Sequence, residues 1–144
     1  MTAPLTQQIL HATTVALKDR ALLIVGPSGS GKSGLALQLM ALGAALVADD
    51  RTLVRKTDTS LWAQAPEGLP PLIEARGIGL LRVPALTPAT QLALAVDMGC
   101  TETERLPSVR QYSVMGQALP LVFHSAAPHF PSALLHYLLH GRSA

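Results

Sequence analysis

The sequence predicts a single α/β domain over residues 1–144, with a mixed sheet and flanking helices. The first observation is that residues 26–33 fit the pattern G-x-x-x-x-G-K-[ST] at every fixed position and directly follow the apolar run 21–25. The second is the order of segments behind it: a helical repeat of leucines, a further apolar run, and two aspartates. Strand, glycine-rich loop, helix, strand and acid is the order of a nucleotide-binding βαβ unit.

The loop is the strongest functional signal in the chain. Its glycines let successive backbone N–H groups point inward at an anion, and the following helix adds its positive N-terminal end. In this pattern the lysine neutralises the β and γ phosphates of a nucleotide, and the last hydroxyl holds Mg²⁺. A Gly-Ser-rich turn without a ligand is the alternative, and the complete pattern disfavours it. The candidate nucleotide-binding residues are Gly26, Pro27, Ser28, Gly29, Ser30, Gly31, Lys32 and Ser33.

The composition excludes several classes of protein. Charged residues make up 14% of the chain, against roughly 25% in ordinary soluble domains, so we expect a homo-oligomer in which another copy covers part of the surface. A formal net charge of +2 and 3% aromatic residues argue against a nucleic-acid partner. The N-terminus lacks a basic segment followed by an apolar one, and prolines interrupt the uncharged stretch 111–141. We therefore expect a cytoplasmic protein without a membrane span.

Cysteine and histidine give little support for a resident metal. Cys100 is the only cysteine, which excludes an intrachain disulfide and a multi-cysteine metal site, and it is expected as a core or turn residue. His136 and His140 are one helical turn apart, but no glutamate follows His136 as H-E-x-x-H requires. Zinc is therefore not expected.

The segment before the loop predicts a hairpin. Residues 8–17 are rich in Thr and Val and predict one strand, and a polar turn at 18–20 leads into a second strand over 21–25. His11 lies early in the first strand, where a half-buried structural histidine is the ordinary interpretation.

The segment after the loop predicts a helix and an acidic strand end. Leucines at the spacing of one helical face predict a helix over 32–42 that ends at Gly43. A strand over 44–48 then ends in Asp49 and Asp50. An acid pair after a strand is often only a turn, but a bound triphosphate needs a carboxylate within reach, which favours a site.

The middle of the chain contains an apolar run with unusual charges. Strands at 51–54 and 60–64 and a proline-rich loop at 66–71 precede it. Within 72–83, Glu74 lies among glycines, two arginines and apolar residues. Buried charges have to be paired or used, and glycines permit close approach of the backbone to a ligand. The alternative is a structural ion pair of Glu74 with Arg76 or Arg82.

The last third predicts a strand at 91–96, a polar loop over 98–110, a hairpin around Gly116-Gln117, and a helix. Pro131 suits a first helical position, the leucines that follow share one face, and Gly141 is the expected stop.

From His11 to Leu106, the segments resemble the catalytic domain of HPr kinase/phosphorylase, a P-loop kinase with a carboxykinase-like mixed sheet. Five segments in the right order carry the resemblance: His11, the loop Gly26–Ser33, the acid pair in Leu46–Arg51, the run Leu72-Ile73-Glu74-Ala75-Arg76-Gly77-Ile78-Gly79, and Glu104-Arg105-Leu106.

The resemblance implies transfer of a phosphoryl group from ATP, or pyrophosphate in some members, to a serine of the phosphocarrier protein HPr, with Mg²⁺ and with reversal by phosphorolysis. It implies that Asp50 accepts the serine proton, with Asp49 beside it and His11 supporting the carboxylate. It also implies a hexamer, in keeping with the low charge. By the same resemblance, Lys32 binds the phosphates, and Ser33 and Glu74 are the magnesium ligands. Arg105 is implied as an active-site arginine.

The chain departs from the family pattern at three places. Ten residues precede His11 where members commonly have a full domain, so we expect a short form without the regulation that domain provides. Gly34 stands where an acid usually follows the serine of the loop. The late segment Pro-Val-x-Pro-Gly-Arg-Asn, linked to dephosphorylation, has no counterpart in residues 119–125. We therefore expect a kinase without efficient phosphorylase activity.

Two other functions remain open at this point. One is a small-molecule kinase on a related P-loop scaffold, with Arg76, Arg82 and Arg105 available to bind its substrate. The other is a nucleotide-binding module that senses ATP and contacts a partner without transfer.

Overall fold

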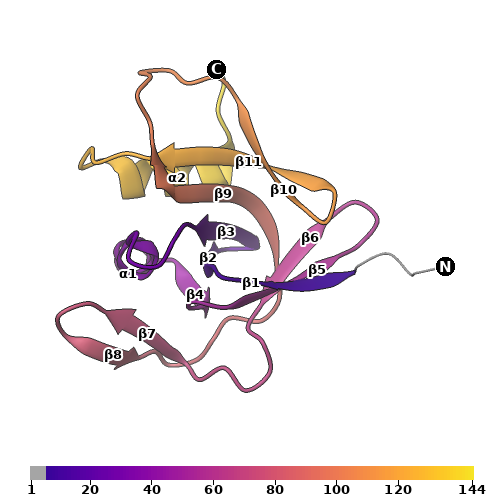
Figure 1. Ribbon diagram of the computed structural model, residues 1–144, viewed down its shortest axis with the longest axis vertical. Coiled ribbons are helices and arrows are strands. Elements are labelled where there is room, and N and C mark those ends of the chain that lie inside the picture. The colour runs from indigo at the N-terminus through magenta and orange to yellow at the C-terminus, as the bar shows by residue number, and fades with distance from the viewer. Residues whose placement is uncertain (1–5) are drawn as a thin grey trace.

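The computed structural model describes residues 6–144 and confirms the α/β class with a mixed sheet (Figure 1). Nine strands form one large sheet with the order β1-β5-β6-β9-β3-β2-β4, and β11 and β10 extend it from β9. Its strands are β1 (Gln7–Leu10), β2 (Thr13–Leu17), β3 (Arg20–Val25), β4 (Ala45–Ala48), β5 (Thr52–Lys56), β6 (Leu61–Gln64), β9 (Thr90–Thr101), β10 (Arg110–Val114) and β11 (Gln117–His124). Strands β7 (Leu72–Ala75) and β8 (Gly79–Arg82) form a separate antiparallel hairpin.

Strand β3 is central to this sheet. It pairs with β2 on one side and runs parallel to β9 on the other. Its side chains alternate between two cores: Leu22 and Ile24 pack with the helices, whereas Leu23 and Val25 pack against residues of β5, β6 and the β10–β11 hairpin. A strand buried on both faces is expected to be continuously apolar, as this one is. The loop that follows β3 therefore starts from a rigid position.

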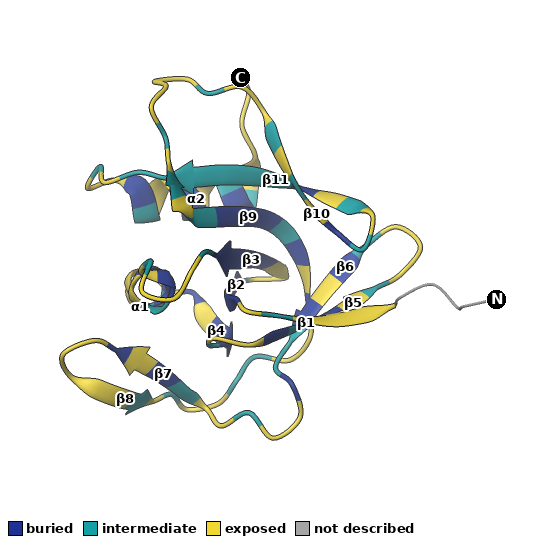
Figure 2. Cartoon of the chain, in the orientation of Figure 1, coloured by how far each residue is buried: buried dark blue, intermediate teal, exposed yellow. Residues whose placement is uncertain are grey.

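The two helices cover the same face of the sheet. Helix α1 (Lys32–Ala41) contributes Leu35 and Leu39 to the first core, and helix α2 (Phe130–His140) contributes Leu134 and Leu138. Figure 2 shows the burial concentrated in β2, β3, β9 and the inner sides of both helices, with the β7–β8 hairpin more exposed. Both helices begin within a residue of the predicted positions. Neither is long and apolar enough to span a membrane, so residues 6–144 contain no such helix.

The predicted strand over 8–17 is wrong in one respect, because the chain forms two strands. Strand β1 pairs with β5, whereas β2 pairs with β3 and β4, and the break falls at His11 and Ala12. A single segment with two sets of partners has to change direction between them. Ala12 is fully buried at this point and His11 is exposed, so the break turns His11 out of the sheet.

Strand β9 also differs from the prediction, and the run 72–83, for which the sequence predicted no element, is ordered. Strand β9 continues to Thr101, into the predicted loop 98–110, because β11 pairs with it as far as that residue. The run 72–83 is a hairpin whose turn contains Gly77 at a φ of 84°. This hairpin places β7 beside α1, where Ile73 joins the core.

Candidate active site

The loop between β3 and α1 adopts a conformation that depends on glycine. Gly26, Gly29 and Gly31 have φ values of 144°, 81° and 97°, in the region that residues with a Cβ rarely adopt. A Cβ on Gly26 would lie 2.7 Å from the Ser30 Oγ and 3.2 Å from the backbone nitrogen of Gly99. The loop therefore closes tightly on itself and on the end of β9.

The start of α1 fits an anion. Gly31 caps the helix without a side-chain hydrogen bond, so the backbone N–H groups of the first turn face outward at its positive end. The Ser30 hydroxyl is buried and has no partner within residues 6–144. Lys32 is 7% exposed, and its Nζ donates to the carbonyl oxygens of Gly26 at 2.9 Å and Pro27 at 3.1 Å. These groups form the donor-rich, positive environment that phosphate oxygens require.

Asp49 joins three elements around the loop. Its Oδ1 accepts hydrogen bonds from the hydroxyls of Ser33 at 2.7 Å and Thr13 at 2.9 Å, and its Oδ2 accepts one from the backbone N–H of Glu74 at 3.0 Å. The carboxylate thus connects α1, β2 and β7. These hydrogen bonds hold the Ser33 hydroxyl and the backbone of Glu74 beside Asp49. Thr13 was missed by sequence reasoning because a threonine in a strand gives no signal of a contact 36 residues away.

Asp50 faces the open side of the site and pairs with His11. The Nε2–H of His11 donates to the Asp50 Oδ1 over 2.7 Å, and both side chains are about half exposed or more, at 49% and 67%. Asp50 has a φ of 70°, which aspartate tolerates better than most residues, and its backbone N–H donates to Thr13 Oγ1 at 3.2 Å. The break between β1 and β2 is what brings His11 to this position.

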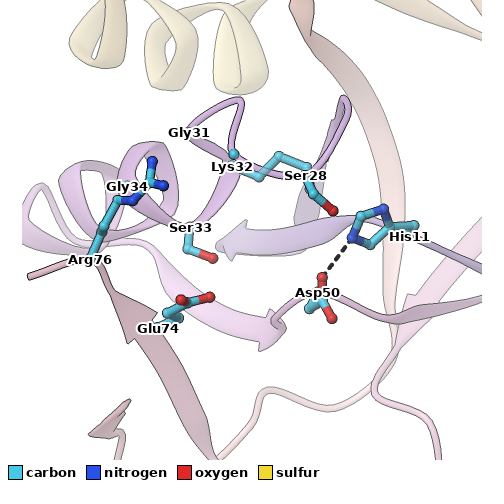
Figure 3. A pocket seen from close by; sticks show the side chains of 10 residues that line it. His11, Ser28, Gly31, Lys32, Ser33, Gly34, Asp50, Glu74 and Arg76 are labelled. Atoms are coloured by element: carbon cyan, nitrogen blue, oxygen red, sulfur yellow. Dashed lines mark hydrogen bonds and ion pairs between the residues drawn. The ribbon is translucent and has the colours of Figure 1, made fainter. Parts of the chain in front are cut away.

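The side chains surround one pocket of about 360 Å³ (Figure 3). Figure 3 shows His11 and Asp50 at one end, Lys32 and Ser33 above, and Glu74 below. The full lining consists of His11, Ser28, Gly29, Gly31, Lys32, Ser33, Gly34, Asp50, Glu74 and Arg76. The structure therefore brings together the loop, the acid pair, His11 and Glu74.

The residues present fit a magnesium ion that is shared with phosphates. Among residues 6–144, His, Cys, Asp and Glu side chains form no cluster of three or more that could hold a metal alone. Mg²⁺ commonly takes one or two protein ligands, with substrate phosphates and waters completing the octahedron. The Ser33 hydroxyl and the Glu74 carboxylate border the same pocket and would serve in this way.

Arg105 lies apart from this pocket. It is exposed in the loop between β9 and β10 and does not line the pocket. The base of that loop is fixed by Glu102, which accepts the backbone N–H groups of Glu104 and Thr103 and pairs with Arg110. The Glu104 N–H, followed by the Arg110 guanidinium, holds the pKa of Glu102 below its ordinary value. Within one chain, Arg105 therefore does not meet the other candidate residues.

The sequence suggests two roles for Arg76, an ion pair with Glu74 or substrate binding in a small-molecule kinase. It borders the phosphate-loop pocket, and in the described residues it forms no ion pair with Glu74. The structural ion pair of Glu74 with Arg76 or Arg82 is likewise absent from residues 6–144.

The fold and the loop define this protein as a P-loop protein with a carboxykinase-like mixed sheet. The family model described as "HPr Serine kinase C-terminal domain" matches residues 4–105. The chain belongs to this family.

Relatives and a solved structure agree with this assignment. The chain is 39% identical over 109 residues to an HPr kinase/phosphorylase of Caldicellulosiruptor bescii, covering 74% of this chain and 32% of that protein. It is 33% identical over 153 residues to the HPr kinase/phosphorylase of Limosilactobacillus reuteri, covering 89% of this chain and 48% of that protein. The chain thus spans about a third to a half of these relatives. The structure of the Hpr(Ser) kinase/phosphatase from Coxiella burnetii shares the fold, with a TM-score of 0.72, 24% identity, and coverage of 92% of this chain and 88% of that one.

Proposed function

We propose that this chain is an ATP- and Mg²⁺-dependent protein-serine kinase whose acceptor is HPr or an HPr-like phosphocarrier protein. The observation that carries the proposal is the His11–Asp50 pair, which faces Lys32 and Ser33 across one pocket. Phosphoryl transfer needs a base for the acceptor hydroxyl and positive charge for the phosphates, placed on opposite sides of the reacting group. The names of the relatives supply the nature of the acceptor.

In the proposed reaction, each side chain of the site has one role. The serine Oγ of the carrier attacks the γ phosphorus, the bond to the bridging oxygen breaks, and ADP leaves with the electron pair. Asp50 takes the hydroxyl proton through its Oδ2, because the Oδ1 is held by His11. Lys32 and the N-terminus of α1 balance the phosphate charge, and Ser33 and Glu74 hold Mg²⁺, which when bound neutralises charge on the phosphates.

The direct test is incubation with labelled ATP, Mg²⁺ and purified HPr or a related carrier, followed by mapping of the labelled residue by mass spectrometry. We expect label on one serine of the carrier. Label on a small acid but on no protein would favour the small-molecule kinase. ATP binding without transfer to any acceptor would favour the sensing module and overturn the kinase proposal.

We also expect weak phosphorylase activity. Residues 119–125 lack the segment that the resemblance links to dephosphorylation, and they carry no charged side chain for an attacking phosphate. Serine-phosphorylated HPr incubated with the protein, Mg²⁺ and inorganic phosphate should release pyrophosphate far more slowly than the forward reaction consumes ATP. Rapid release, measured by an enzyme-coupled pyrophosphate assay, would contradict this prediction.

A homo-oligomer, hexameric by family resemblance, is part of the proposal. The β7–β8 hairpin exposes Ile78 to 80% and Leu80 to 68%, and exposed apolar side chains of this size favour a protein contact. Light scattering should give a multiple of the chain mass. The double variant Ile78→Asp, Leu80→Asp should shift it toward the monomer, whereas Ala89→Asp, at a small exposed residue outside the hairpin, serves as the comparison. A monomeric wild-type protein would remove the prediction.

A further inference from the structure

A second hollow, of about 550 Å³, lies on the other side of the phosphate loop. Gly34, Leu35 and Gln38 of α1 form one wall, and the segment 124–131, from the last residue of β11 to the first turn of α2, forms the other. Gly31 and Gly34 border both hollows, so the first turn of α1 separates them. In Figure 1 the β11–α2 segment and the β7–β8 hairpin lie on opposite sides of α1.

The chemistry of this hollow differs from that of the phosphate pocket. Asp, Glu, Lys and Arg are absent from its lining, whereas the phosphate pocket contains four such side chains: Lys32, Asp50, Glu74 and Arg76. Met98 and Phe130 provide apolar surface, and the amide of Gln38 and the hydroxyl of Ser125 provide hydrogen-bonding groups. Walls without formal charge that offer both hydrogen-bonding groups and some apolar surface suit the uncharged part of a ligand better than a phosphate.

His124 adds an aromatic edge to this wall. Its ring lies edge-on to Phe130, with centroids 5.7 Å apart and an interplanar angle of 83°. This contact fixes the ring beside the hollow, and aromatic rings favour offset or edge contacts with other ring systems.

The reaction fixes which end of a triphosphate faces which hollow. The γ-phosphoryl end has to lie toward Asp50, because that carboxylate receives the acceptor proton. The opposite end then leaves the phosphate pocket where it is bordered by Gly31 and Gly34, which have no side chain to block the way. That exit leads directly to the uncharged hollow.

From this arrangement, we infer that the hollow between α1 and segment 124–131 holds the nucleoside of the phosphoryl donor. The inference rests on the proposed function and deepens it, because it makes the donor a nucleoside triphosphate in preference to pyrophosphate. The walls contact only the uncharged part of the donor, so they contribute to affinity for ATP and not to affinity for its phosphates.

Calorimetric titration with Mg²⁺ tests the inference without any carrier protein. ATP should bind the wild-type protein at least about tenfold more tightly than tripolyphosphate, which carries the same phosphates without a nucleoside. Ala126→Trp adds an indole at an exposed position of the segment and should weaken ATP binding about tenfold while leaving tripolyphosphate within about twofold. Gln38→Trp should do the same from the α1 wall.

The matched control is Ala89→Trp, at an exposed alanine that lines neither hollow, and it should change neither affinity. Equal affinities of the wild type for ATP and tripolyphosphate would overturn the inference. So would variants that weaken both ligands equally or that weaken neither. Because no transfer is measured, a failed carrier assay and a failed nucleoside assay remain distinguishable.

Discussion

Asp50→Asn is expected to lower the rate of phosphoryl transfer to the carrier at least about a hundredfold, the lower range for loss of a general base. The amide cannot take the hydroxyl proton, but it has nearly the same shape as the carboxylate. Asparagine also tolerates the φ of 70° found at this position, and its Oδ1 can still accept from His11 Nε2. The backbone and the pocket should therefore remain intact.

Single-turnover transfer and calorimetric ATP binding measure this prediction together. The Kd for Mg-ATP should change by less than about twofold, because the base acts on the acceptor and not on the phosphates. Asp58→Asn, at an exposed aspartate in the turn between β5 and β6, is the control and should leave both quantities unchanged. An equal loss of ATP affinity and transfer rate would assign Asp50 to the nucleotide instead.

Gly26→Ala is expected to destabilise the protein by roughly 1–3 kcal/mol and to weaken ATP binding more than about tenfold. An alanine here would have to keep a φ of 144°, and its Cβ would lie 3.2 Å from both the Gly99 nitrogen and the Met98 Cβ. Ser30 can rotate away from its 2.7 Å contact, but the backbone of β9 cannot. Relief of the strain has to move the loop and, with it, the inward-facing N–H groups.

Urea unfolding and calorimetry check the effect of this substitution. Gly34→Ala is the comparison for stability, because Gly34 is helical and a Cβ there meets no heavy atom within 4 Å. That substitution should raise the free energy of unfolding by about 0.5–1 kcal/mol through helix propensity. A Gly26→Ala protein as stable and as tight-binding as the wild type would show that the loop tolerates a side chain.

The phosphate loop and the order of elements around it could be predicted from local sequence. A glycine pattern, a leucine repeat and an apolar strand each act within about ten residues, so periodicity and turn chemistry detect them. For this reason α1 begins at Lys32 as expected, and β4 ends immediately before Asp49. The resemblance then pointed to His11 and Glu74 in the same site.

The contacts that assemble the site could not be predicted in the same way. Residues 8–17 have one uniform composition, and only pairing with β5 on one side and with β3 and β4 on the other divides them at His11. The extension of β9 to Thr101 likewise depends on β11, which comes later in the chain. A motif match does not give the distance between Arg105 and the other site residues, and the structure places Arg105 on the β9–β10 loop, away from the phosphate pocket.

The two hollows beside α1 also divide the sequence. Outside the loop and the helix they share, the residues around the acid pair all lie before residue 77, and those of the uncharged hollow all lie after residue 97. A substitution in the last third of the chain can therefore alter the uncharged hollow without changing the lining of the phosphate pocket. The two hollows can therefore change independently during evolution. By design, a new segment between β11 and α2 can be introduced while the acid pair stays as it is.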